Sequence, residues 1–451
     1  MGSRYNVVLV IIDTLRWDRV GCLGSNYPTM PSVDSLCRES MAFTNHYSEA
    51  IPTHPSFTTM FTGTTPLIHG IVSHAGSVRL GNILMLAELL NREGYVTIAV
   101  DNLATHTMAG WFARGYGYYF NIGGLVVISR GVKTNGDYVN VKAREAFDLL
   151  TRYHRDESFF MFIHYWDPHT PYIPPKGYAE RFYKGDYTRG DLASRLNSTR
   201  WGRSLLRGGW MRDLLNSGVN DLDYVRALYD GEVAYVDERF SELMRMISDL
   251  GLLEDTMIII TSDHGEGLGE HNVFFDHHTL YEWDVKTPLI IRLPDKLTDE
   301  IGRGRVRGIA YSGLVQNTDI APTILDALGV AKPSSMTGVS LLEAAKGNFK
   351  GHDAVYSLEN TRQTTRMIRV GEWKLIQWIR DDTYGKKAGH IELYNLAKDP
   401  AESRNLAEEE RETALRLLGL MEERYRRIVG SKDPLTLQEI SLPISEDKPP
   451  L

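Results

Sequence analysis

The sequence predicts an α/β protein built on a doubly wound sheet, in which buried parallel strands alternate with helices that cover both faces. Short apolar runs that end shortly before an acidic residue predict the strands, at 7–12, 96–100, 159–164 and 257–261. Helical spacing of apolar residues lies between and after them, at 83–92, 141–153, 225–250 and 319–328. Because open α/β sheets build their sites at the carboxyl ends of strands, the polar residues after these runs are the first candidates for function.

The composition is that of an ordinary globular protein with a large core, since 42% of its 451 residues are hydrophobic. Its 50 Lys and Arg against 58 Asp and Glu give a formal net charge of -8, which disfavours binding to nucleic acid or to an anionic membrane. The longest apolar runs fall short of the ~18 residues of a membrane span, so we expect a cytoplasmic protein. We expect Cys22 and Cys37, the two cysteines, to be buried thiols outside any disulfide framework.

Pattern changes divide the chain into segments. Residues 1–330 carry the alternation of strands and helices and form the expected catalytic domain. An Arg-rich and aromatic segment interrupts it at 176–221, and is either a solvated surface excursion or a cap whose arginines meet an anionic substrate. Residues 331–430 predict a small α+β C-terminal domain, and 431–451 form a tail without periodicity.

Two strand ends carry residues suited to a divalent cation. Asp13 and Thr14 follow the first strand, where the carboxylate serves either a metal or the N-terminus of a helix. Asp263 and His264 follow the fourth strand and can supply one oxygen and one imidazole nitrogen to an ion. The alternative for this pair is a capped turn with a solvated histidine, although burial of an unpaired Asp would be costly.

Three further histidines are candidates for acid, base or ligand roles. His169 lies in a loop that two prolines hold stiff, so it is either a rigidly placed functional group or a packed turn residue. His277 and His278 follow within fifteen residues of Asp263, and this enrichment indicates a histidine-lined site.

Thr53 begins a segment that the pattern predicts as a short helix ending at Gly63. Its hydroxyl is either part of a helix start or a nucleophile for an anionic ester, since the helix dipole favours negative charge at that end.

Together these segments resemble the sulfatase family of the alkaline phosphatase superfamily, from Asn6 to about Ala407. The family signature Cys-x-Pro-Ser-Arg, followed by a Thr-Gly pair, matches 53–57 and 62–63, with Thr53 in place of the Cys and Phe57 in place of the Arg. Other family landmarks match at 66–70, 94–95, 117–120, 167–171, 262–265, 279–282, 319–323, 371–374, 393–396 and 399–400. The resemblance implies an alkaline-phosphatase-like mixed sheet with a small α+β C-terminal domain.

The resemblance also implies a metal site and its surroundings. The positions of the family's metal ligands are occupied by Asp13, Thr14, Thr53, Asp263 and His264, and Thr14 replaces a second aspartate. The ion would be Mn, Zn, Ca or Mg, and a second ion could use Asp167, His169 and His277. By the same resemblance His169 and His277 lie near the leaving group as proton donors, and the substrate-binding positions fall on His74, Asn102 and His278.

The departures from the family pattern decide the expected chemistry. A sulfatase oxidises its Cys or Ser to formylglycine, and Thr53 cannot yield that aldehyde. The resemblance to the superfamily's phosphoesterases therefore favours a metal-activated Thr53 that attacks a phosphate mono- or diester and forms a phosphothreonine. The expected substrate is a small anionic ester; the alternatives are a sulfuric ester hydrolase of arylsulfatase type and a catalytically impaired binding protein. The oligomeric state is not predicted.

Overall fold

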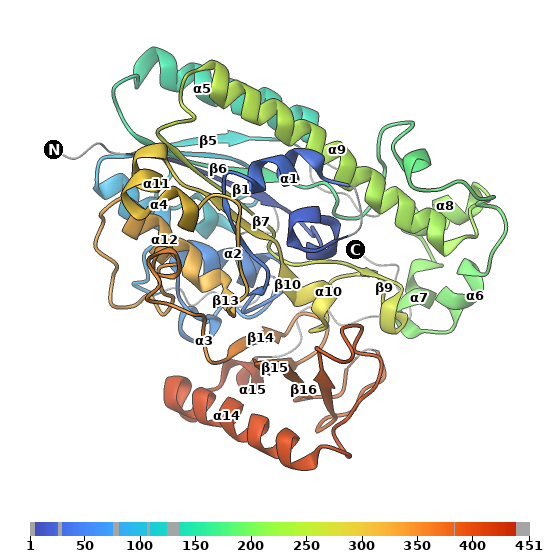
Figure 1. Cartoon of the computed structure of the whole chain (residues 1–451). Helices are drawn as coiled ribbons and strands as arrows, with labels where there is room; N and C mark the ends of the chain where they lie inside the picture. The colour runs from blue at the N-terminus through green and yellow to red at the C-terminus, as the bar shows by residue number, and fades with distance from the viewer. Residues whose placement is uncertain are drawn as a thin grey trace.

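The computed structural model describes residues 5–25, 29–74, 81–105, 109–123, 135–382 and 384–438. The chain forms a large α/β unit with a smaller antiparallel sheet and a helix at one end (Figure 1). The predicted tail at 431–451 lies outside the described residues from 439 onward. None of the helices in the described ranges has both the length and the apolar character that a membrane crossing requires.

An eight-stranded mixed sheet forms the centre of the large unit. The four strands predicted from apolar runs are all present as β1, β4, β6 and β7, and β1 pairs in parallel with β6 and β7. β11 is antiparallel to both of its neighbours, which makes the sheet mixed. In spatial order the strands are β12 (Ile309–Tyr311), β2 (Met41–Phe43), β11 (Leu289–Arg292), β7 (Thr256–Thr261), β1 (Asn6–Ile12), β6 (Phe159–Tyr165), β4 (Val96–Asp101) and β5 (Tyr118–Asn121).

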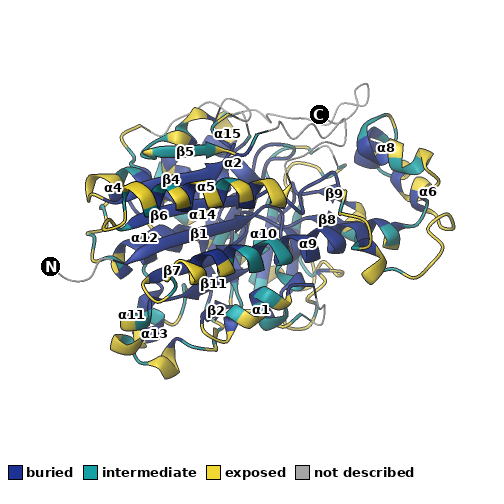
Figure 2. Ribbon diagram, turned by 90° about the horizontal axis from the view of Figure 1, so that it is seen from above, coloured by how far each residue is buried: buried dark blue, intermediate teal, exposed yellow. Residues whose placement is uncertain are grey.

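Helices cover both faces of this sheet, which is why its central strands are continuously apolar. Every residue of β1, β4, β6 and β7 is buried (Figure 2). On one face lie α1 (Pro31–Cys37), α5 (Gly136–Tyr153) and α9 (Leu222–Asp249); on the other lie α2 (Thr53–Thr62), α4 (Leu86–Arg92) and α12 (Ile320–Ala327). The carboxyl ends of the parallel strands are therefore where polar groups meet.

Asp237 of α9 fixes the start of α1 from a distance. Its carboxylate accepts backbone N–H bonds from Ser32 (2.9 Å) and Val33 (3.0 Å), donors that a helix start leaves without partners. Burial raises the pKa of Asp237 to about 6, although these two N–H groups oppose the shift. The contact ties two covering helices together at one face of the sheet.

The C-terminal unit is a four-stranded antiparallel sheet between a helix and the large unit. One face, with Leu358 and Leu375, packs on Leu417 and Met421 of α14. The other face packs on the large unit near Tyr281. The elements are β14 (Val355–Glu359), β15 (Thr365–Val370), β16 (Trp373–Trp378), β17 (Ile391–Asn395), α14 (Arg411–Val429) and α15 (Pro434–Leu437). A β-bridge between Ile51 and Glu359 brings the end of β14 beside the start of α2.

Lys374 of β16 joins the two units through a buried cluster of charges. Its side chain is fully buried, and its Nζ lies 3.1 Å from Oε1 of Glu282 and 2.8 Å from Oε1 of Glu402. Glu282 opens α10 (Glu282–Val285), and its backbone N–H donates to Glu402 at 2.6 Å. Burial, partly opposed by Lys374, raises the pKa of Glu402 to about 7.

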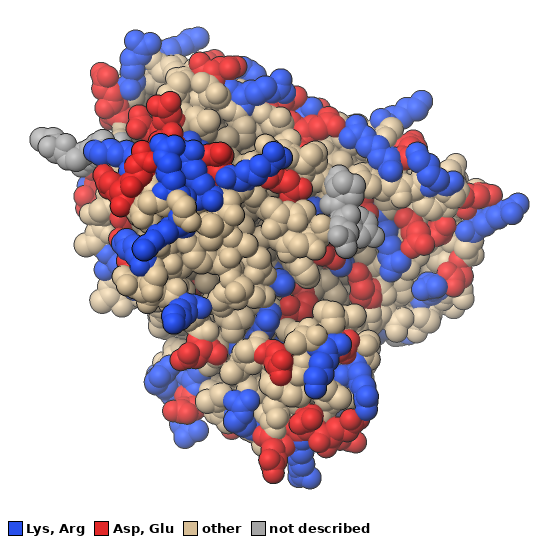
Figure 3. Space-filling view, viewed as in Figure 1, with Lys and Arg blue, Asp and Glu red and all other residues tan. Residues whose placement is uncertain are grey.

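The predicted insertion at 176–221 is helical and lies at the edge of the large unit (Figure 1). Its helices are η5 (Ala179–Arg181), α6 (Leu192–Asn197), α7 (Arg200–Leu205) and α8 (Gly209–Asn216). Trp201 and Trp210 are buried, whereas Arg195, Arg200 and Arg207 are exposed. Basic and acidic side chains are interspersed over this region on the face drawn in Figure 3. The insertion therefore anchors through its tryptophans and leaves most of its arginines in solvent.

The expectation of free thiols is wrong, because Cys22 and Cys37 form a disulfide in the structure. Cys22 lies in η2 (Gly21–Leu23), which folds back on α1, and Cys37 is the last residue of that helix. The fold brings the two Cα atoms within 6.4 Å, a separation that a disulfide spans. The sequence spacing of fifteen residues does not reveal this return of the chain.

The remaining helices and strands of the described ranges are short. They are η1 (Trp17–Arg19), β3 (His46–Tyr47), α3 (Pro66–His69), η3 (Gly110–Ala113), β8 (Gly267–Leu268), η6 (Glu270–Asn272), β9 (Phe274–Asp276), β10 (Lys286–Thr287), α11 (Asp295–Ile301), η7 (Arg303–Arg305), β13 (Val315–Gln316), η8 (Asn317–Asp319) and α13 (Leu342–Lys346). β10, β3 and β13 form a three-stranded sheet, and β8 pairs with β9.

Candidate functional site

The predicted metal ligands converge at the carboxyl end of the large sheet. Asp13 follows β1, and Asp263 and His264 follow the neighbouring β7. Thr53 comes to the same place as the first residue of α2. Adjacent parallel strands end at the same edge, so residues 250 positions apart become neighbours.

Asp13, Asp263 and His264 are arranged as a cation would require. One ligand atom from each lies within 4.8 Å of the others, and all three side chains are fully buried. Among the described residues, both carboxylate oxygens of Asp13, Oδ2 of Asp263 and the hydroxyl of Thr14 have no hydrogen-bond partner. Buried carboxylates without partners are costly, and a divalent cation would satisfy these oxygens. The residues present therefore fit a metal ion.

The imidazole of His264 is oriented by its own loop. Its Nδ1 lies 2.9 Å from the carbonyl oxygen of Gly265, which can accept its proton. Its Nε2 then faces Oδ2 of Asp263 and the hydroxyl oxygen of Thr53, each at 3.2 Å. Burial alone would lower the pKa of His264, but the carboxylates of Asp263 and Asp13 raise it to about 10. The cluster thus attracts positive charge, which either a proton or a cation supplies.

Thr14 stands in an unusual backbone conformation that Tyr229 of α9 stabilises. The φ angle of Thr14 is 55°, in the left-handed region that β-branched residues disfavour. The Tyr229 hydroxyl donates to the carbonyl of Thr14 (2.8 Å) and accepts from the N–H of Arg16 (3.0 Å). The N–H of Thr14 donates to Oδ1 of Asp263 at 3.3 Å. This buried tyrosine therefore holds the loop after β1, and that loop is hydrogen-bonded to Asp263 after β7.

His164 is a site residue that the sequence analysis did not single out. It lies on β6 between two carboxylates, with Nδ1 2.8 Å from Oδ1 of Asp101 and Nε2 3.3 Å from Oδ2 of Asp13. Burial lowers the pKa of His164, but the two nearby carboxylates raise it to about 9. Phe57 packs against its ring, with centroids 5.0 Å apart. A histidine inside an otherwise apolar strand is the signal that could have found it.

The predicted proton donors His169 and His277 lie side by side, with ring centroids 5.0 Å apart. The carbonyl oxygen of Thr170 lies 2.7 Å from Nδ1 of His169 and can accept its proton. The ring of His277 stacks on that of His264, with centroids 4.5 Å apart. Burial, and then the charge of neighbouring His264, lowers the pKa of His277 well below its usual value. His277 is therefore neutral at pH 7, which suits a ligand better than an acid.

The predicted substrate-binding residues differ in what surrounds them. Asn102 is buried, and its amide donates to the carbonyl of Gly123 (3.1 Å) and accepts from the indole N–H of Trp166 (2.7 Å). These contacts give Asn102 a packing role. His74 is only half-buried, and its ring lies 4.2 Å from that of His54, the residue after Thr53. His74 therefore borders the site.

The C-terminal sheet supplies site residues that sequence reasoning missed. Glu359, at the end of β14, lies 3.2 Å from Nδ1 of His278 through its Oε1. Arg362, three residues later, lies 3.3 Å from Oδ2 of Asp276 and stacks its cation on Trp201 of the insertion at 4.4 Å. The C-terminal unit and the insertion thus meet beside the histidines.

The class of this protein is defined by its alkaline-phosphatase-like sheet, which carries buried carboxylates and imidazoles at its strand ends. Comparison with known proteins identifies the family. The family model described as sulfatase matches residues 5–330, and that described as N-sulphoglucosamine sulphohydrolase, C-terminal, matches residues 269–427. The chain belongs to the sulfatase family of hydrolases, as the resemblance predicted. The predicted fold class is confirmed as well.

Individual relatives agree with this assignment. An arylsulfatase of Clostridium perfringens is 23% identical over 452 residues, which cover 90% of each chain. The solved structure of BT4656 in complex with its substrate D-glucosamine-2-N,6-O-disulfate has a TM-score of 0.74 and 22% identity, covering 97% of this chain and 100% of the other. The phosphonate monoester hydrolase of Agrobacterium radiobacter has a TM-score of 0.72 and 21% identity, covering 94% and 96%.

Proposed function

We propose that this protein hydrolyses phosphate or phosphonate esters through the hydroxyl of Thr53, with a divalent cation held by Asp13, Asp263 and His264. The observation that carries the proposal is the position of Thr53. Its Oγ1 lies 3.2 Å from Nε2 of His264, at the N-terminus of α2 and beside the two buried carboxylates.

The chemistry of threonine argues against a formylglycine. The Cβ of Thr53 carries a methyl group, so its oxidation would give a ketone and not the aldehyde that sulfatases use. The nucleophile would therefore be the hydroxyl itself, which needs activation because a threonine hydroxyl is scarcely ionised at pH 7. Phe57, fully buried among aromatic rings, replaces the cation that the family signature places there.

Each residue has a role that its position supports. A cation bound by Asp13, Asp263 and His264 would lower the pKa of a coordinated hydroxyl and take up charge on a phosphoryl oxygen. Thr53 Oγ1 would lose its proton to solvent and form the new bond to phosphorus, while the bond from phosphorus to the ester oxygen breaks and His169 protonates that departing oxygen. The N-terminus of α2 favours the added negative charge. Water then cleaves the phosphothreonine and releases the phosphate.

Sulfate ester hydrolysis is the second candidate function. It is favoured by the names of relatives, because the Clostridium perfringens relative is an arylsulfatase and the substrate in the BT4656 complex carries sulfates. The phosphonate monoester hydrolase of the same fold favours the first candidate. The two functions predict opposite preferences for phosphate and sulfate esters with the same leaving group.

The test compares esters of one leaving group. Metal-stripped protein is reloaded with Mn²⁺ or Zn²⁺ and assayed on p-nitrophenyl phosphate, bis-p-nitrophenyl phosphate, a p-nitrophenyl phosphonate and p-nitrophenyl sulfate. We expect metal-dependent turnover of the phosphorus esters, a loss on the order of 10³-fold or more in Thr53→Val, and most activity kept in Thr53→Ser. Val keeps the shape of Thr, so it isolates the hydroxyl. A preference for the sulfate, or unchanged turnover in Thr53→Val, would overturn the proposal.

A further inference from the structure

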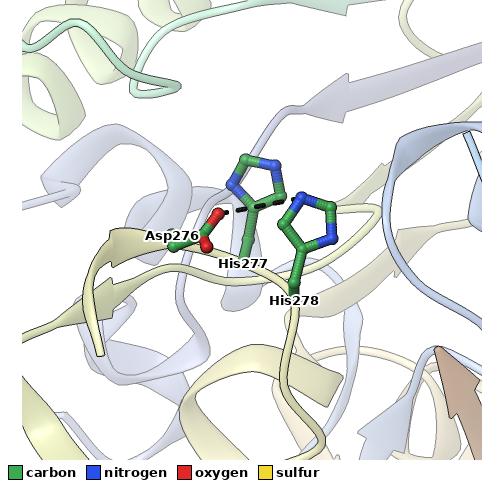
Figure 4. Close-up of side chains that lie close together, drawn as sticks. All are labelled: Asp276, His277 and His278. Atoms are coloured by element: carbon green, nitrogen blue, oxygen red, sulfur yellow. Dashed lines mark ion pairs between the residues drawn. The ribbon is translucent and has the colours of Figure 1, made fainter. Parts of the chain in front are cut away.

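A second group of metal-ligating side chains lies next to the first. Asp276 ends β9, and His277 and His278 follow it directly; all three side chains are buried. One ligand atom from each lies within 4.8 Å of the other two. In Figure 4 the ring of His277 lies beside the line that joins the carboxylate of Asp276 to the ring of His278. The group shares no residue with Asp13, Asp263 and His264.

Hydrogen bonds outside this group orient two of its ligand atoms toward each other. Oδ2 of Asp276 accepts from the hydroxyl of Tyr384 at 2.5 Å and lies 3.3 Å from Nε of Arg362. Nδ1 of His278 lies 3.2 Å from Glu359. These contacts leave Oδ1 of Asp276 and Nε2 of His278 facing each other at 3.7 Å. A carboxylate on the far nitrogen of a histidine is the usual outer contact of a metal ligand.

The distances suit an ion between the ligands. Tetrahedral bonds of about 2 Å to zinc separate two ligand atoms by roughly 3.3 Å, close to the spacing of Asp276 and His278. Arg362 contacts the other oxygen of Asp276, so its cation does not fill the space between the ligands.

Glu266 is an independent observation that favours a cation beside His277. Its side chain is fully buried, and neither of its carboxylate oxygens has a hydrogen-bond partner in the described part of the chain. Its Oε1 lies 3.4 Å from Nδ1 of His277, which is likewise without a hydrogen-bond partner there. An unpartnered buried carboxylate behind a ligand histidine is stabilised by a cation on the far side of that ring.

We propose that Asp276, His277 and His278 bind a second divalent cation, with zinc preferred. Two imidazoles and one carboxylate are the protein ligands of many catalytic zinc sites, and three ligands leave a fourth position open for water or substrate. The ring of His277 stacks on that of His264, so the second site adjoins the first. The inference goes beyond the proposed function, because the ion binds with or without a substrate.

The experiment counts ions without measuring activity. The full chain is stripped of metal, given slightly more than two equivalents of zinc per chain, freed of unbound metal and analysed by mass spectrometry for zinc per chain. We expect two ions in the wild type, one in His278→Ala, one in Asp263→Asn and two in His271→Ala. His271 is the matched control, an exposed histidine that stacks on Tyr281. One ion in the wild type, or two in His278→Ala, would overturn the proposal.

A second measurement covers the case in which His278→Ala does not fold. Crystals of the wild type are soaked in zinc, and the anomalous difference map should place one peak between Asp276 and His278 and another beside Asp13. A single peak beside Asp13 would refute the second site. Thr53→Val protein should keep both ions, so a failure of the threonine mechanism and a failure of the second site give different results.

Discussion

Replacing Lys374 by Met should destabilise the protein strongly, because this lysine is the buried partner of two carboxylates. Its Nζ lies 3.1 Å from Glu282 and 2.8 Å from Glu402, and its side chain is fully buried. At an effective dielectric constant of about 20, each attraction amounts to about 5 to 6 kcal/mol. The cost of dehydrating the ammonium offsets part of this, but Lys374→Met leaves Glu402 buried without this cation and leaves Glu282 with the more distant guanidinium of Arg369, whose Nη1 lies 3.6 Å from its Oε2. We therefore expect a loss of about 3 to 5 kcal/mol in the free energy of unfolding.

The loss should depend on pH in a defined direction. Burial already raises the pKa of Glu402 to about 7, above its value in the unfolded chain. A carboxyl group whose folded pKa is raised stabilises the fold below its unfolded pKa, and that contribution is lost as the pH rises through the folded value. Removing Lys374 raises the folded pKa of Glu402 further. The destabilisation should therefore be larger at pH 8 than at pH 5.5.

Urea unfolding followed by tryptophan fluorescence at both pH values measures this effect. Lys398→Met is the control, because Lys398 is exposed beyond β17. Adding Glu402→Gln to Lys374→Met removes the carboxylate that has lost its cation and should recover part of the loss. A loss below about 1 kcal/mol at pH 8, or the same loss at both pH values, would refute the reasoning.

Three further predictions concern the site and its supporting helices. Tyr229→Phe removes the hydroxyl that bridges the carbonyl of Thr14 and the N–H of Arg16, so we expect about 1 to 3 kcal/mol less stability in urea and weaker binding of the first metal ion; unchanged metal affinity would contradict this. Asp13→Asn should remove the part of the Mn²⁺-induced rise in melting temperature that comes from the first site, equivalent to about 4 kcal/mol at a thousandfold excess over its Kd, whereas the exposed Asp148→Asn should keep it. Asp237 has a pKa of about 6 in the folded protein, above its value in the unfolded chain, so its ionisation destabilises the fold as the pH rises from about 4 to 6. Relative to Asp237→Asn, the free energy of unfolding of the wild type should fall by up to about 3 kcal/mol over that window. A constant difference between the two proteins would count against a raised pKa for Asp237.

The C-terminal sheet lies beside the candidate site. Glu359 and Arg362 extend from the end of β14 toward His278 and Asp276, and Trp201 of the insertion lies against Arg362. Three segments far apart in the chain therefore border one side of the histidine cluster. The C-terminal unit therefore contributes side chains to the surroundings of the candidate site.

The sequence by itself determined the local elements and the meeting of Asp13, Asp263 and His264 at one edge of the sheet. Continuous apolar runs predicted β1, β4, β6 and β7, because strands buried on both faces cannot alternate with polar residues. Asp13, Asp263 and His264 could be predicted because they follow such strands, and the carboxyl ends of parallel strands share one edge of the sheet. Family membership was likewise readable from the spacing of short motifs.

Only the tertiary structure decided which distant groups meet. The pairing of Cys22 with Cys37, the place of His164 between two carboxylates, and the contact of Glu359 with His278 depend on how elements pack, and local spacing carries no record of it. The same holds for Asn102, whose amide the fold engages in packing contacts. The helical or strand periodicity of side chains is set by neighbours in the chain, whereas the partner of a buried charge is set by the cost of leaving it unpaired anywhere in the folded molecule.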